Sequence, residues 1–122
     1  MKLHINKETT IQEIQKEFNA CYPFLKVEFF RYLPKRKPIL SAELLCASET
    51  LKHIESFYEG RIVDIDKNRT IHDILKDFET MFGMSAHIFR KSGNVWVETS
   101  LTDDWTLEEQ NKEGEQISGH FK

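Results

Sequence analysis

Two stretches of this chain nearly repeat one another: Ile5-Asn6-Lys7-Glu8-Thr9-Thr10-Ile11-Gln12-Glu13-Ile14-Gln15-Lys16-Glu17-Phe18 and, sixty residues later, Ile65-Asp66-Lys67-Asn68-Arg69-Thr70-Ile71-His72-Asp73-Ile74-Leu75-Lys76-Asp77-Phe78. Seven of the fourteen positions are identical, and three more exchange Glu for Asp or Asn for Asp. Average composition would give about one identity. The chain is therefore predicted to contain two copies of one supersecondary unit.

Each copy is predicted to fold as a strand, a helix and a second strand. The helices begin at capping boxes, Thr10-x-x-Glu13 in copy one and Thr70-x-x-Asp73 in copy two, where hydroxyl and carboxylate bond early backbone N–H groups. Apolar residues then recur on one stripe of each helix. With the inward face of the strands they form the predicted core: Ile11, Ile14, Phe18, Ile71, Ile74, Phe78, Val27, Phe29, Ile88 and one face of 95–99.

The second strands of the two copies align only after a one-residue slip. Pro23 is predicted to end the first helix because proline does not fit a helix interior, and Gly83 to end the second as a left-handed cap. Beyond these residues an offset of 59, which sets Glu28 over His87, keeps the inward side chains in register.

Two such units predict an α+β fold. Both units would contribute to one antiparallel or mixed sheet with the helices on one face, which is a ferredoxin-like arrangement. The alternative is a β-grasp-like sheet built by copy two, with copy one packed against it.

At 122 residues the chain is predicted to form one domain. A hairpin turn is expected at Lys91-Ser92-Gly93-Asn94, and a short helix opened by Thr106-x-x-Glu109 should end near Gly114. The predicted boundaries are a domain over 1–114, pseudo-repeats 1–31 and 61–91, a hairpin and short helix over 92–114, and a mobile tail over 115–122.

Composition excludes several classes of protein. The net charge of −3 disfavours general binding to nucleic acid or to an anionic membrane. There is no apolar stretch of the length of a signal peptide or membrane span, so a cytoplasmic protein is expected. Cys21 and Cys46 form no C-x-x-C pair and are expected to be reduced. No P-loop, G-x-G-x-x-G or H-E-x-x-H occurs, so the sequence names no catalytic residue or cofactor and favours a non-enzymatic protein.

The sequence offers one candidate metal site and one candidate acid–base pair, and a simpler interpretation is favoured for each. None of the five histidines has metal-ligand spacing, and scattered histidines are the favoured interpretation, although His4 and His87 could meet across neighbouring strands. Asp103-Asp104 could be a carboxylate pair with one raised pKa, but acids at the start of the following helix are favoured.

Two surfaces outside the repeat are candidate binding sites. A basic loop carries Arg31, Tyr32, Lys35, Arg36 and Lys37, which could clamp single-stranded nucleic acid, although four charges give little phosphate affinity.

The second surface is acidic and carries both tryptophans, and it is the preferred candidate for binding a protein partner or a second copy. The competing interpretation is that both tryptophans belong to the core. Its residues are Trp96, Glu98, Asp103, Asp104, Trp105, Glu108 and Glu109.

Three parts of the chain carry a family pattern: the run Phe89 to Thr99 (F-R-K-S-G-N-V-W-V-E-T), the run Thr102 to Asn111 (T-D-D-W-T-L-E-E-Q-N), and Phe18 with the run Tyr22 to Phe30. Through them most of the chain outside residues 32–60 resembles a family of small uncharacterised bacterial proteins. It implies one compact bacterial domain and no particular chemistry.

Overall fold

A computed structural model describes residues 1–32, 42–44 and 60–119, with backbone alone for 31–32 and 42–44. The elements are β1 (Lys2–Ile5), α1 (Ile11–Cys21), β2 (Leu25–Tyr32), β3 (Ala42–Leu44), β4 (Arg61–Asp64), α2 (Ile71–Phe82), β5 (Ser85–Ser92), β6 (Val95–Glu98), the 3-10 turn η3 (Ser100–Thr102) and α3 (Leu107–Gly119). The predicted strand, helix and strand are present in both copies, and the α+β class is confirmed.

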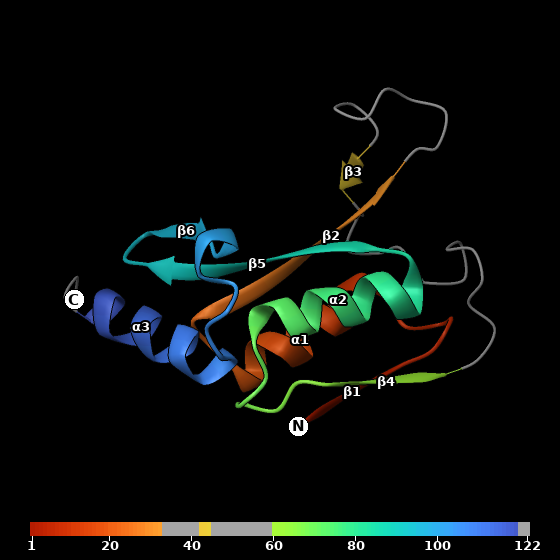
Figure 1. The fold of residues 1–122 in the computed structure, drawn as a ribbon, viewed down its shortest axis with the longest axis horizontal. Coiled ribbons are helices and arrows are strands. Elements are labelled where there is room, and N and C mark those ends of the chain that lie inside the picture. Colours follow the sequence, from red (N-terminus) through yellow and green to blue (C-terminus); the bar gives the residue numbers. More distant parts are fainter. Residues whose placement is uncertain (33–41, 45–59, 120–122) are drawn as a thin grey trace.

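The described strands form two antiparallel sheets, so the prediction of one ferredoxin-like sheet is wrong for this part of the chain. β1 pairs with β4, and a second sheet has the order β3-β2-β5-β6, which is not a β-grasp sheet either. In Figure 1, α1 and α2 lie between the two sheets, and each helix contacts strands of both. The apolar pattern specifies which face of a strand is buried, but not which sheet the strand joins.

Each strand pairs with its counterpart in the other copy. Leu3 lies opposite Val63, its equivalent at an offset of 60, and Glu28 lies opposite His87, its equivalent at an offset of 59. Antiparallel pairing centred on equivalent positions is the register of a two-fold axis, as at an isologous interface. The one-residue slip inferred from the sequence is thus confirmed by the strand register.

The repeat is longer than predicted, because β3 and β6 are also equivalent. β3 pairs with β2 from Phe30 onward, and β6 pairs with β5 from Phe89 onward. Phe30 and Phe89 are equivalent at the offset of 59. Each copy is therefore a strand, a helix and a hairpin.

The buried core lies where the two copies meet and contains the predicted helix and strand residues. The prediction that one face of 95–99 joins it is wrong for β6, where Val95 is 59% and Val97 41% exposed. Tyr22 joins the copies through the core, since its hydroxyl donates to the Ile65 carbonyl at 2.6 Å. Burial raises the pKa of this hydroxyl.

The helix ends follow the predicted signals. Both capping boxes form, with Thr10 accepting from the Glu13 N–H and Thr70 from the Asp73 N–H. The Thr70 backbone N–H holds the pKa of Asp73 below its ordinary value. α1 ends at Cys21, before Pro23, and α2 ends at Phe82, where Gly83 with φ of 64° is the left-handed cap.

The prediction that the last helix ends near Gly114 is wrong, because α3 continues through this residue to Gly119. Gly114 is a contact residue, not a helix cap. A Cβ there would lie 2.8 Å from the Phe24 Cβ and 3.1 Å from the Arg90 Cγ. The missing side chain lets α3 approach β2 and β5 closely, and the side-chain oxygen of buried Gln110 accepts a hydrogen bond from the Arg90 guanidinium at 2.9 Å.

We predict that Gly114→Ala lowers the free energy of unfolding by about 1–3 kcal/mol, because the new methyl group overpacks the α3 contact. Gly119→Ala, in the same helix with nothing within 4 Å of the added carbon, is the control and should cause no loss. Urea unfolding of both variants makes the comparison. Equal stability of the two variants would contradict the packing role of Gly114.

Candidate functional site

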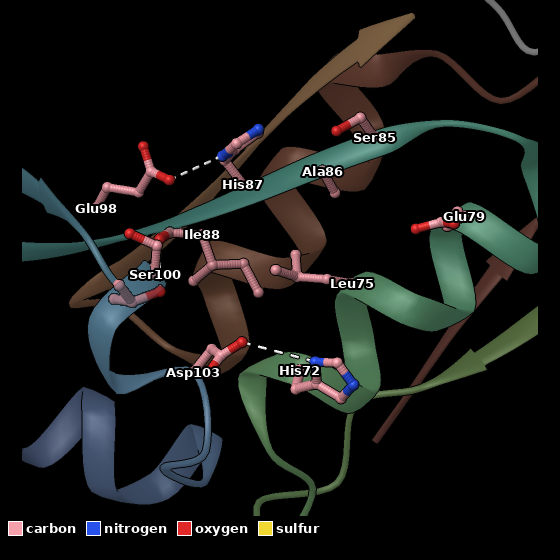
Figure 2. Close-up of a pocket in the computed structure, with 11 residues that line it drawn as sticks. His72, Leu75, Glu79, Ser85, Ala86, His87, Ile88, Glu98, Ser100 and Asp103 are labelled. Carbon is pink, nitrogen blue, oxygen red and sulfur yellow. Dashed lines mark hydrogen bonds and ion pairs between the residues drawn. The ribbon is translucent and has the colours of Figure 1, made fainter.

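A pocket of about 280 Å³ lies between α2 and the first half of β5, and we call it the α2–β5 pocket (Figure 2). Helix α2 forms one wall, β5 a second, and the segment after β6 a third. The residues lining it are His72, Leu75, Glu79, Ser85, Ala86, His87, Ile88, Glu98, Thr99, Ser100 and Asp103.

The pocket exists because β6 is shorter than β5. β6 pairs with β5 only as far as Phe89 opposite Glu98. Thr99 then ends the pairing, donating its N–H at 3.1 Å and its hydroxyl at 2.7 Å to the Ile88 carbonyl. The chain next turns into η3, so the edge of β5 before Ile88 forms a wall of the pocket.

Two histidine–carboxylate pairs flank the pocket (Figure 2). His87 Nδ1 lies 3.0 Å from the Glu98 carboxylate, and His72 Nδ1 lies 3.6 Å from that of Asp103. The His87 ring also meets the Phe30 ring edge-on, at 5.1 Å between centroids. Each imidazole is therefore oriented by a carboxylate of a different chain segment.

The segment that carries Asp103 is fastened to the start of α2. The first N–H groups of a helix have no partner within the helix. Here the Ile71 N–H donates to the Trp105 carbonyl at 3.0 Å and the His72 N–H to the Asp103 carbonyl at 2.8 Å. Asp103 is thereby fixed beside the pocket by the backbone.

The charge of the pocket lining is negative. Glu79, Glu98 and Asp103 line it, and no lysine or arginine does so among the described residues. Over the same residues no group of three or more His, Cys, Asp or Glu side chains is placed to hold a metal ion. By charge, such a lining favours a cationic group over an anionic one.

The predicted acidic tryptophan surface is not one continuous site. Glu98 and Asp103 line the pocket. Trp96 lies on the outer face of the larger sheet, where the Lys26 ammonium is 5.0 Å from the centroid of its ring. Trp105 packs against the Arg90 guanidinium at 5.8 Å. Both indoles are half-buried, so neither the core nor the fully exposed interpretation holds.

The remaining acids of that surface have local partners or face solvent. Asp104 is exposed. Glu108 is ion-paired with Lys67 at 3.8 Å, and Glu109 completes the capping box predicted at Thr106. The Thr106 backbone N–H holds the pKa of Glu109 below its ordinary value. Thr106 rather than Asp103 or Asp104 is thus the residue that caps α3.

Two other candidates are separated or fall outside the described residues. His4 and His87 do not meet, because β1 pairs with β4 while β5 belongs to the other sheet. Arg31 and Tyr32 lie at the end of β2, and Lys35, Arg36 and Lys37 lie outside the described residues.

Sequence reasoning missed Leu75, Glu79 and His72 as site residues. The signal was present in the repeat, since these positions replace Gln15, Asn19 and Gln12 of copy one. The rest of this helix largely repeats the sequence of copy one, so these three replacements are the differences that could have indicated a site.

The structure is thus an α+β fold with an acidic pocket at the edge of a strand. Comparison with protein-family models, curated proteins and solved structures gave no significant match. No helix among the described residues has the length and apolarity needed to cross a membrane.

We predict intermediate tryptophan fluorescence from Trp96→Phe and Trp105→Phe, each of which leaves one indole. Each remaining ring has one face against a cation and is partly open to water, so acrylamide should quench it to an intermediate degree. Blue-shifted emission that resists quenching in either variant would contradict the half-buried geometry.

Proposed function

We propose that this chain is a non-enzymatic protein-interaction domain that binds a positively charged partner at the α2–β5 pocket. The observation that carries the proposal is a concave site walled by three carboxylates with no lysine or arginine among its described residues. Such a site attracts a cationic group and disfavours anionic partners by charge.

The surroundings of the pocket support protein binding. Leu101, in the turn beside Ser100, is 96% exposed, and the exposed residue Asp104 lies shortly after it in the sequence. An apolar side chain next to carboxylates supplies both area and charge to an interface. Part of the acidic surface predicted from the sequence, Glu98 and Asp103, thus takes part in the proposed site.

Enzymatic activity finds less support. Histidine–carboxylate pairs occur in acid–base sites, but here all four side chains are more than a third exposed, with His72 at 65%.

One observation favours single-stranded nucleic acid as a second candidate ligand. The outer face of the larger sheet presents Phe89 and Trp96 with Lys26 over both rings, at 5.5 and 5.0 Å. Aromatic rings on a sheet can stack bases. Glu28 and Glu98 lie on the same face, however, and their charge opposes phosphate. We therefore rank this candidate second.

We predict that Glu79→Lys abolishes capture of the native partner, because it places a cation in the acidic pocket. The measurement is affinity purification from the native cell with the tagged protein, followed by mass spectrometry. Glu17→Lys is the control, since it makes the same charge change at an exposed position of α1. Partners retained equally by wild type and Glu79→Lys would contradict the pocket as the binding site.

A further inference from the structure

The backbone N–H and C=O of Ala86, at the edge of β5, both point toward the α2–β5 pocket. The Ile88 carbonyl accepts from Thr99, so the backbone groups of Ile88 point away from β2. Because this direction alternates along a strand, the N–H and C=O of Ala86 point the same way. Among residues 1–32, 42–44 and 60–119 no hydrogen-bond partner meets them.

Copy one has the same strand edge, and there side chains of α1 bond two of the edge carbonyls. Val27 is the equivalent of Ala86, and its carbonyl accepts a 2.9 Å hydrogen bond from the Gln15 amide. The Leu25 carbonyl accepts another, also of 2.9 Å, from the Asn19 amide. Two side chains of α1 therefore occupy the edge of β2 in place of a neighbouring strand, and we call them the amide seal.

Copy two lacks the amide seal. The positions of Gln15 and Asn19 are taken by Leu75 and Glu79, and neither a hydrocarbon nor a carboxylate can donate a hydrogen bond. Figure 2 shows Leu75 and Ala86 facing one another across the pocket. The side chains of α2 therefore donate no hydrogen bond to Ala86 of the kind that Gln15 donates to Val27.

We propose that an extended peptide segment carrying lysine or arginine adds to the edge of β5 as a further strand, bonding both backbone groups of Ala86. This inference rests on the proposed function and specifies its partner. Strand addition is an established mode of peptide recognition, in which backbone bonds give affinity and side-chain pockets give specificity.

The pocket also specifies the pattern of the segment. Side chains of an added strand alternate between the two faces of the sheet. One set faces Leu75 on α2 and is apolar, and the other set lies beside Glu98 on the outer face and is basic. The pairing is short. Beyond Ala86, Met84 can offer only its carbonyl, because its N–H already donates to the Phe78 carbonyl. The basic side chains therefore contribute much of the affinity.

The test restores the amide seal at one position. Leu75→Gln places a donor where Gln15 stands in copy one and leaves all three carboxylates intact, while Leu75→Met is the matched control without a donor. Thermal unfolding first confirms that both variants fold. The probe is Ac-Lys-Val-Lys-Val-Lys-NH2, titrated into the ¹⁵N-labelled protein and followed by NMR. A second peptide of the same sequence carries N-methyl groups on both valines, which block strand pairing.

We predict that wild type and Leu75→Met bind the unmodified peptide, with a shifted Ala86 amide that is protected from exchange. Leu75→Gln, and separately the methylated peptide, should each weaken binding about tenfold or more. Absence of binding to wild type, or equal binding of the two peptides, would overturn strand addition, and so would equal binding by all three proteins.

Failure of this inference is distinguishable from failure of the proposed function. If strand addition is overturned while Glu79→Lys still abolishes partner capture, the partner is held by charge and the interaction domain stands. If Glu79→Lys leaves capture unchanged, the proposed function itself is wrong.

Discussion

The structure depends on antiparallel pairing between equivalent strands of two copies, with Leu3 opposite Val63 and Glu28 opposite His87. The order β3-β2-β5-β6 is symmetric about the β2–β5 pair, and each helix contacts strands of both sheets. The Tyr22–Ile65 hydrogen bond ties the copies together within the core. The buried core lies where the two copies meet, so each copy covers the apolar face of the other.

Much of the local structure could be predicted because its causes are local. Thr10 and Thr70 begin helices through bonds to residues three positions on, and Gly83 ends α2 through its own backbone freedom. The division into two sheets could not be predicted, because the alternation in β1 would be the same beside any partner strand. Gly114 was misread for a similar reason. A glycine within a helix pattern can be a cap or a close contact, and only Phe24 and Arg90, both distant in sequence, decide between them.

The candidate site depends on residues that differ between the copies, and a comparison that looks for identical positions passes over them. Composition and motifs drew attention to the acids near Trp105, most of which have local partners such as Thr106 and Lys67. The α2–β5 pocket combines residues of α2, β5 and the segment after β6, and its shape follows from the point at which Thr99 leaves the edge of β5. No short string in the sequence encodes that point.

The amide seal has a consequence for how such a chain can diverge. Two separate identical subunits related by a two-fold axis must have both strand edges sealed or both open, because one sequence serves both sides. Unsealed edges on both sides would invite open-ended chain-to-chain pairing, which proteins avoid at sheet edges. Joining the copies covalently removes that constraint. Gln15 and Asn19 can bond the carbonyls of one edge while Leu75 and Glu79 leave the equivalent groups of the other without such a donor, so the two equivalent edges can have different roles in the fused chain.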